Sequence, residues 1–275
     1  RSIWILDDLT VLHQLQPDSR NAQTLLFKPK ESYRTKGRGG KSSLTAGTNL
    51  PNGVIVHYFL KNYDAEKDTV ELQFQSEDGA VIKTYSTKVK KNKLEVKAGG
   101  NEFVWDTRYD GAEKLEGMIF WSASFSGAKA VPGSYKVRLA VNGKEQKQDF
   151  TILPDPRSES SVTDMQKQFD FVNEVNQTVD KAHKAIKNMR EIRSKLKDFV
   201  IQNQSDSTAT KLVAQAKTIQ EDLLEVEKTL YQTQNRSNQD PLNFPIRLTN
   251  KLGHLNRLLT IDDFPPTNQD LEVKE

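Results

Sequence analysis

The hydrophobic pattern of this chain changes its period at residues 153–156, which read LPDP. Before that point, apolar and polar residues alternate. This is the pattern of β-strands with one buried face and one solvent-exposed face. After that point, apolar residues recur every three to four positions, which is typical of amphipathic helices. The sequence therefore predicts a multidomain chain, with an all-β module followed by an all-α module.

The β half carries strand and turn signals at short intervals. Residues 54–60, 70–75, 81–85, 103–105 and 135–141 are rich in branched and aromatic side chains, and a last arm runs to residue 152. Asp78-Gly79 and Asn142-Gly143 are hairpin-turn dipeptides between them. Around seven strands in about 100 residues predict an immunoglobulin-like or fibronectin-like antiparallel β-sandwich over residues 53–154. Because the chain has no cysteine, Trp105 and its apolar neighbours are expected to form the core.

The α half carries two long apolar stripes and one short one. They run over residues 165–199, 212–230 and 248–259, and the last follows Pro245, which suits the first turn of a helix. Neither long helix can bury its stripe alone, so we expect an antiparallel three-helix bundle over residues 155–264. Residues 265–275 are expected to be a tail or the start of a helix that would complete a truncated four-helix bundle.

Bulk composition narrows the class of protein. The 275 residues are 35% hydrophobic and 28% charged, which fits a soluble chain with two cores. No run approaches the roughly eighteen apolar residues that span a bilayer, so no membrane span is predicted. A net charge of +3 is too small to indicate nucleic acid as a partner. The absence of cysteine excludes a disulfide framework and cysteine-ligated zinc.

Residues 28–52 form a basic, glycine-rich segment that we interpret as a linker. Its run from Thr35 to Ser42 is similar to a phosphate-binding loop, but that pattern requires glycine where Thr35 stands. The cationic side chains of Lys36, Arg38 and Lys41 are therefore candidates only for contact with a polyanion.

No residue pattern indicates catalysis, a cofactor or a metal. The four histidines lie outside metal-ligand spacing, and no serine stands between glycines as in a nucleophile elbow. Adjacent carboxylates on a strand point to opposite faces, so Asp7 and Asp8 are poorly placed to share a site. Exposed aromatic residues, Trp121 above all, are candidates for stacking on a glycan or contacting a protein ligand.

Four segments carry a family resemblance: residues 1–10 (RSIWILDDLT), 46–54 (AGTNLPNGV), 101–109 (NEFVWDTRY) and 132–139 (PGSYKVRL), followed by DPR at 155–157. In this order they resemble the C-terminal region that follows the β-propeller in bacterial proteins with sortilin-like or neuraminidase-type repeats. Those proteins are often labelled glycosyl hydrolases. Residues 101–109 are also similar to the immunoglobulin-like domain of flagellar hook-capping proteins.

The resemblance implies that residues 1–27 are the remnant of a terminal propeller strand with its connector. It implies an upstream propeller of the same polypeptide as partner, and a location in the bacterial periplasm or outside the cell. The leading hypothesis is a non-catalytic accessory region that packs against the propeller or presents a surface to a partner. The alternatives are a glycan- or protein-binding module, and part of a propeller glycosidase whose active site lies outside this chain.

Overall fold

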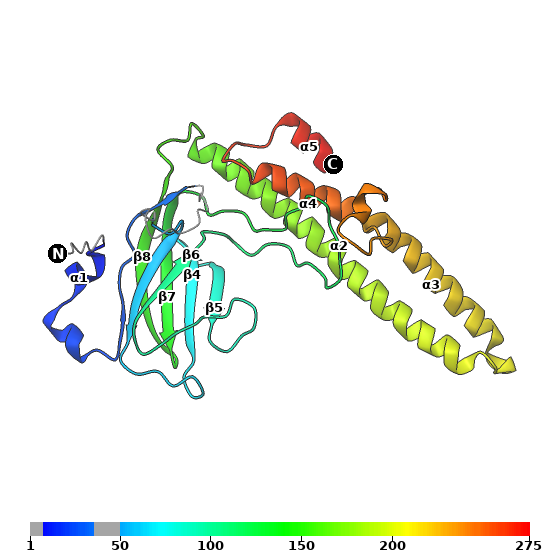
Figure 1. Ribbon diagram of the computed structural model, residues 1–275, viewed down its shortest axis with the longest axis horizontal. Coiled ribbons are helices and arrows are strands. Elements are labelled where there is room, and N and C mark those ends of the chain that lie inside the picture. Colours follow the sequence, from blue (N-terminus) through cyan, green and yellow to red (C-terminus); the bar gives the residue numbers. More distant parts are fainter. Residues whose placement is uncertain (1–7, 36–49) are drawn as a thin grey trace, which may run out of the picture. The chain divides into compact units, whose positions relative to one another are not determined.

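A computed structural model describes residues 8–35 and 50–275 of the chain (Figure 1). Strands come first and helices last, so the β-then-α order expected from the hydrophobic period is confirmed. The chain divides into two compact units. The β unit takes the residues up to 110 together with 129–162, and the α unit takes 111–128 together with 163–275.

Two sheets make up the described part of the β unit. The first is antiparallel and has the order β1 (Thr24–Leu26), β3 (Val54–Leu60), β6 (Gly99–Trp105). The second has the order β2 (Ser32–Arg34), β8 (Lys144–Pro154), β7 (Gly133–Val141), β4 (Val70–Ser76), β5 (Val81–Ser86). All its pairs are antiparallel except β2 with β8, which run parallel; β2 lies before the range 53–154 in which the sandwich was expected.

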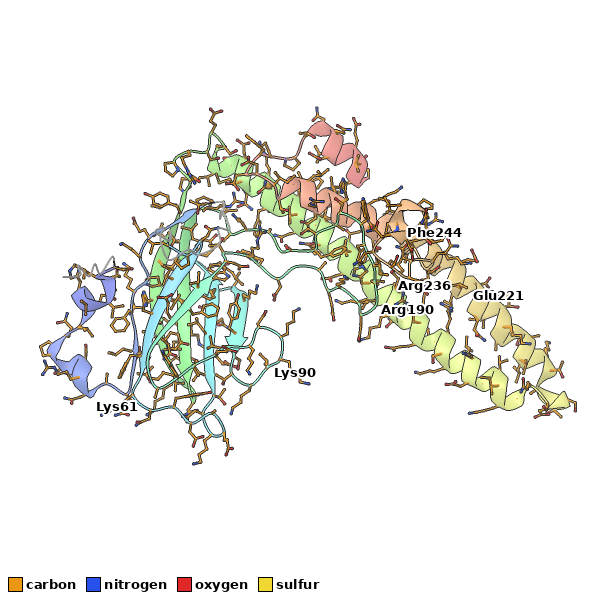
Figure 2. The ribbon with its side chains drawn as sticks, viewed as in Figure 1. Lys61, Lys90, Arg190, Glu221, Arg236 and Phe244 are labelled. Atoms are coloured by element: carbon orange, nitrogen blue, oxygen red, sulfur yellow. The ribbon has the colours of Figure 1, made fainter. Side chains whose placement is uncertain are left out.

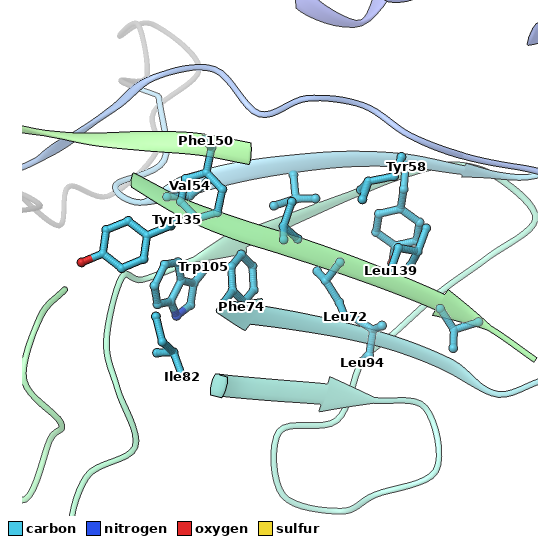
Figure 3. Close-up of a cluster of buried hydrophobic side chains, with 14 of the residues drawn as sticks. Val54, Tyr58, Leu72, Phe74, Ile82, Leu94, Trp105, Tyr135, Leu139 and Phe150 are labelled. Atoms are coloured by element: carbon cyan, nitrogen blue, oxygen red, sulfur yellow. The ribbon is translucent and has the colours of Figure 1, made fainter. Parts of the chain in front are cut away.

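One buried cluster receives side chains from both sheets (Figure 3). Its centre is Trp105 of β6, which stacks on Phe74 of β4 with 4.4 Å between ring centroids. The Trp105 Nε1 donates a hydrogen bond to the Arg108 carbonyl at 3.2 Å, so the polar end of the indole is satisfied. At the start of β7, the Tyr135 hydroxyl donates to the Val131 carbonyl at 2.6 Å. The prediction that Trp105 anchors the core is confirmed.

The hairpin turns contain residue types that readily adopt a positive φ angle. Asn142 and Gly143 have φ values of 51° and 81°, and two consecutive positive values define the turn that matches the twist of paired strands. Gly79 has a φ of 89° in the turn between β4 and β5. Both turns lie where the dipeptides Asn142-Gly143 and Asp78-Gly79 predict them.

The unit boundaries differ from the expected ones in two places. Residues 1–27 and 28–52 were expected to be a remnant and a linker, but β1 and β2 lie within these ranges and pair with β3 and β8. Strands of three residues are too short to show a period. Residues 111–128 were expected in the sandwich, but they belong to the α unit, because their apolar side chains pack against its helices.

The helix α2 (Val162–Asn203) is the spine of the α unit (Figure 1). Its first half packs against α4 (Leu248–Leu259), and residues further along it pack against α3 (Thr210–Leu230), which returns antiparallel after the short turn η2 (Ser207–Ala209). The leucine stripe of residues 248–259 is confirmed as a helix. Pro245 lies before its first turn, however, because α4 begins only at Leu248.

Four further elements are short. The single-turn helices α1 (Thr10–Gln14) and η1 (Pro17–Asn21) precede the first sheet, and η3 (Asp240–Leu242) lies between α3 and α4. The last helix, α5 (Asn268–Lys274), begins at the expected place, where Thr267 and Asp270 cap each other's backbone amides.

Candidate functional site

The β unit carries a cleft beside sheet β1–β3–β6. Its volume is about 1510 Å³. In β3, alternate residues such as Val56 enter the buried cluster, so His57 and Phe59 point to the opposite face and line the cleft. The N-terminal elements supply another wall through Val11 and Leu15. The cleft is therefore built from three segments of the same unit, which lie within residues 11–27, 57–59 and 95–102.

The α1 segment beside this cleft is held by polar contacts and not by a core of its own. The Gln14 side chain accepts from the Lys28 amide at 2.7 Å and donates to the Lys28 carbonyl at 3.0 Å. It thus binds both backbone polar groups of Lys28, as a residue on a neighbouring strand would. None of the α1 residues is buried. Leu9, Leu12 and Leu15 remain 43%, 52% and 46% exposed. Leu12 lies in α1 and the other two flank it, so this segment presents apolar side chains that no described part of the chain covers completely.

The chemistry of the cleft is that of a binding surface with a charged rim. His57 and Glu102 are register partners across β3 and β6, and the His57 Nδ1 lies 3.9 Å from the Glu102 Oε2. Arg20, Glu95 and Lys97 also line the cleft. In the described ranges 8–35 and 50–275, no three His, Cys, Asp or Glu side chains are placed to hold a metal ion.

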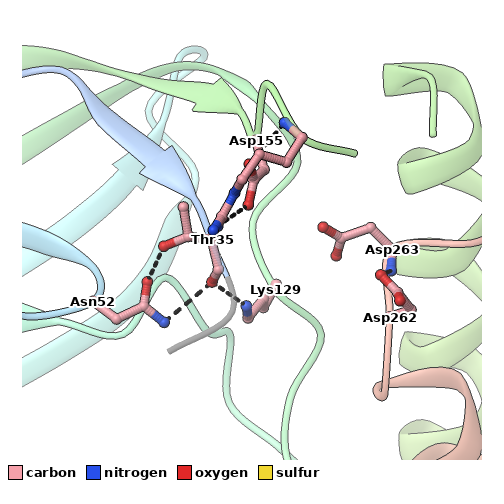
Figure 4. A network of polar contacts seen from close by, with 7 residues as sticks. Thr35, Asn52, Lys129, Asp155, Asp262 and Asp263 are labelled. Atoms are coloured by element: carbon pink, nitrogen blue, oxygen red, sulfur yellow. Dashed lines mark hydrogen bonds and ion pairs between the residues drawn. The ribbon is translucent and has the colours of Figure 1, made fainter. Parts of the chain in front are cut away.

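The polyanion candidates Lys36, Arg38 and Lys41 lie outside the described residues. The residues on either side of that segment contact each other (Figure 4). The Thr35 hydroxyl donates to the Asn52 side-chain oxygen at 2.5 Å, and the Thr35 carbonyl accepts from Lys129 Nζ at 2.9 Å. The hypothesis of a polyanion site stays a prediction.

The aromatic candidate Trp121 lies in the α unit, on the segment 111–128. The Asn250 side chain of α4 makes two hydrogen bonds with the Trp121 backbone. The Asn250 Oδ1 accepts from the Trp121 amide at 2.7 Å, and the Asn250 Nδ2 donates to the Trp121 carbonyl at 2.9 Å. The residue as a whole is 42% exposed. Trp121 is therefore a partly exposed aromatic residue on a fixed backbone, as a stacking surface requires.

Further buried polar contacts hold the segment 111–128 on the helices. The Asn256 Nδ2 donates to the Asn176 Oδ1 at 2.7 Å and to the Ser126 carbonyl at 3.2 Å. At Gly253, an added Cβ would lie 2.8 Å from Ala123 and Phe125, so only glycine allows this close approach. Sequence reasoning missed this site. The signal was the presence of asparagine and glycine on the inward face of an amphipathic helix.

His183 of α2 is buried under the same segment. Its ring lies 5.8 Å from that of Phe120 and 5.6 Å from that of Phe125, and its Nδ1 contacts the Glu113 carbonyl. Burial lowers the pKa of His183 below its usual 6.5, although the Glu113 carbonyl and the Asp180 carboxylate oppose the shift. The histidine is thus neutral in the folded state, with a proton on Nδ1 that is donated to the carbonyl.

The α unit is therefore expected to lose stability as the pH falls through the range below about 6.5. The unfolded state, in which His183 has its ordinary pKa, binds the proton first, and the folded state binds it only at lower pH. Calorimetry between pH 7.5 and pH 5 should show a falling melting temperature. The slope should flatten in His183→Leu and persist in His13→Leu, which changes an exposed histidine. Equal slopes in wild type and His183→Leu would contradict this assignment.

Comparison with protein-family models and with curated protein sequences finds no match for this chain. In the described part of the chain, no helix is long and apolar enough to cross a membrane. Function is consequently argued from the two features that the geometry brings out, the leucine-bearing cleft of the β unit and the exposed Trp121 of the α unit.

Proposed function

We propose that this chain is a non-catalytic accessory region that docks against a neighbouring part of a larger protein through the cleft of its β unit. The observation that supports this proposal is the half exposure of Leu9, Leu12 and Leu15 in and around α1, the last of which lines the open cleft. These side chains are already partly buried, so covering the rest of each contributes about half of the 1.5–3 kcal/mol that complete burial of a leucine is worth. Three such side chains, on a segment that polar contacts already hold in place, would form the apolar centre of a contact.

The architecture that we propose for the β unit is an immunoglobulin-like or fibronectin-like sandwich. Two observations support it. The orders β1-β3-β6 and β8-β7-β4-β5 correspond to the two sheets of such Greek-key sandwiches. The bond from the Tyr135 hydroxyl to the Val131 carbonyl, at the start of β7, has the form of a tyrosine corner. For the α unit we propose a three-helix bundle of α2, α3 and α4, with α5 as a short fourth helix.

The partner that we propose is an upstream β-propeller of the same polypeptide, in a protein of the bacterial periplasm or exterior. The family resemblance of residues 1–10, 46–54 and 101–109 supports this choice. Leu9 belongs to the first of these segments, and Leu12 and Leu15 follow it, so a domain that precedes this chain would be close to them in sequence.

The test is a melting experiment with the region encoded immediately upstream, expressed separately. A rise in the melting temperature of the chain on mixing is expected, because a partner that binds only the folded state stabilises it. Leu12→Asp should weaken this binding at least about tenfold, since it places a charge in the contact. Leu271→Asp is the matched control, because Leu271 of α5 is similarly exposed at 43%. If mixing produces no shift, or if both variants lose the shift equally, docking through α1 is wrong.

A second candidate function is the binding of a glycan or protein ligand at Trp121. The double hydrogen bond from Asn250 favours it, because a fixed backbone lowers the entropy lost when a ligand stacks on the indole. Collisional quenching of tryptophan fluorescence that a polysaccharide relieves in wild type, but not in Trp121→Ala, would support this function. A signal that is unchanged across a broad glycan panel would reject glycan binding.

A further inference from the structure

The less exposed positions of α2 and α3 define a seam between the two helices of the hairpin. These positions alternate by three and four residues, which is the spacing of an antiparallel coiled coil. They are residues 186, 189, 193, 196, 200 and 203 on α2, and residues 213, 216, 220, 223, 227 and 230 on α3. Within the seam, Glu227 is buried and accepts from Arg190 at 2.8 Å and from Arg193 at 2.7 Å, which ties the two helices together.

One side of this hairpin is apolar along its length. The first seam positions of successive heptads are residues 186, 193 and 200 on α2 and residues 213, 220 and 227 on α3. In an antiparallel pair of helices, the residues immediately before these positions all lie on one side of the hairpin. These residues are Ala185, Ile192 and Phe199 on α2, and Leu212, Ile219 and Val226 on α3. We call them the hairpin strip. Such positions usually carry Glu or Lys, but all six are apolar here.

The hairpin strip is largely exposed within the chain. The exposed fractions are 46% for Ile192, 56% for Leu212, 46% for Ile219 and 50% for Val226. The equivalent positions on the opposite side of the seam are mixed: Arg190, Lys197 and Lys217 are charged, and Leu224 and Tyr231 are apolar or aromatic. The strip therefore has the residue pattern of a second seam without a partner helix in the described part of the chain.

The charges that remain outside the seam differ between the two helices. Leaving aside Arg190, Arg193 and Glu227, which pair with one another, residues 184–198 of α2 hold four basic and two acidic side chains, a balance of +2, and residues 211–228 of α3 hold three of each, a balance of zero. Figure 2 labels Arg190 of the seam on α2 and Glu221 on α3. Beside the strip, the exposed Lys195 lies along its α2 edge and the exposed Asp222 along its α3 edge, each three residues after a strip residue.

We propose that the hairpin strip is the interface for a second copy of this chain, with two hairpins packed face to face into a four-helix bundle. The two-fold axis runs along the hairpins, so each α2 lies on the α3 of the other copy. This arrangement brings the basic helix onto the more acidic one and Lys195 onto Asp222 of the partner subunit, twice. The other face-to-face arrangement would place α2 on α2, with basic side chains opposed. The proposal is independent of the docking proposed for the β unit, because it uses only residues of the α unit.

The first test is the mass of the whole chain in solution, measured by sedimentation equilibrium from about 1 to 100 µM. A mass of two chains is expected in the upper part of this range. Ile219→Glu should weaken the association at least about tenfold, because it buries a charge within the strip. Thr218→Glu adds the same charge at the next exposed position of α3, away from the strip, and should leave the association unchanged. A chain that stays monomeric throughout, or a dimer that Ile219→Glu leaves intact, would overturn the proposal.

The second test is a charge exchange that identifies the partner as this same chain. Lys195→Glu and Asp222→Lys each place like charges opposite one another in a dimer of identical copies, so each variant alone should associate less tightly than wild type. In a mixture, Glu at position 195 of one variant meets Lys at position 222 of the other, and the native pair Lys195 and Asp222 forms on the second edge. The mixture should therefore recover dimer, while circular dichroism shows that both variants keep their helices. A mixture no tighter than the separate variants would refute the pairing of α2 with α3.

Discussion

Replacing Trp105 with alanine is expected to destabilise the β unit by about 3–5 kcal/mol. Trp105 has no exposed surface, and it stacks on Phe74 at 4.4 Å while its edge meets Phe150 at 6.2 Å and Tyr135 at 6.3 Å. Removing the indole leaves a cavity between the two sheets and removes the N–H that donates to the Arg108 carbonyl. The chain lacks cysteine, so no disulfide links the two sheets. Their packing therefore depends on this buried cluster.

The measurement is urea denaturation followed by far-ultraviolet circular dichroism, with calorimetry to separate the units. The matched control is Trp121→Ala, in which the same side chain is lost from a position that is 42% exposed. That variant should change stability by well under half as much. If Trp105→Phe were as damaging as Trp105→Ala, the loss would come from the hydrogen bond of Nε1 and not from the volume of the ring.

The second large effect is expected for Asn256→Asp in the α unit. Asn256 is completely buried, and its Nδ2 donates to two oxygens, the Asn176 Oδ1 and the Ser126 carbonyl. Aspartate has nearly the same shape but places a carboxylate oxygen against both acceptors. The folded state must then hold a buried charge or bind a proton. At pH 7, binding that proton costs up to about 4 kcal/mol, since it is about 3 pKa units from the ordinary value of 3.9 and each unit is worth about 1.4 kcal/mol.

The variant should therefore recover stability relative to wild type as the pH falls. The carboxyl introduced at position 256 has a raised pKa when folded, so the penalty is greatest above that pKa and disappears below the ordinary value. Denaturation curves of both proteins at pH 7 and pH 4.5 provide the comparison. Asn188→Asp makes the same chemical change on the exposed side of α2 and should cost little at either pH. A penalty that stays constant between these pH values would mean that shape, and not charge, is responsible.

The cause of this sensitivity is that segment 111–128 has no regular structure of its own. Its conformation depends on α4, where the Asn250 side chain hydrogen-bonds the Trp121 amide and carbonyl and the Asn256 side chain donates to the Ser126 carbonyl. Gly253 lets the Ser124 amide reach the Gly253 carbonyl at 2.8 Å. A chain segment between β6 and β7 is thus part of the α unit, which couples the folding of the helices to a region that precedes all of them except α1 in sequence.

Local periodicity predicted much of the fold because burial acts through regular geometry. The alternation around Val56, Leu72 and Leu139 marks strands, and the spacing of Leu252, Leu255 and Leu259 marks a helix. Turn dipeptides located the hairpins, because few residues besides Asn and Gly adopt a positive φ without strain. The position of Trp105 at the centre of the core also followed from the strand pattern and the absence of cysteine.

The candidate sites could be predicted from the sequence only in part. Trp121 was singled out as an exposed aromatic residue, and 42% of it is exposed, but nothing in its neighbourhood predicted that Asn250 would hold its backbone. The leucines at 9, 12 and 15 were expected to belong to a remnant, and their exposure beside a cleft became visible only with the sheet that forms the other wall. The sites combine residues that are distant in sequence, and composition carries no information on such pairs.

The sequence by itself determined the order of the two modules, the strands and helices with a clear period, and the turns that join them. It did so because the alternation of two and the step of three to four are properties of the backbone alone. Only the tertiary structure decided that β1 and β2 join the sheets, that residues 111–128 pack with the helices, and which apolar side chains stay exposed. Those outcomes depend on contacts between distant segments, whose free energy comes from surfaces that meet only after folding.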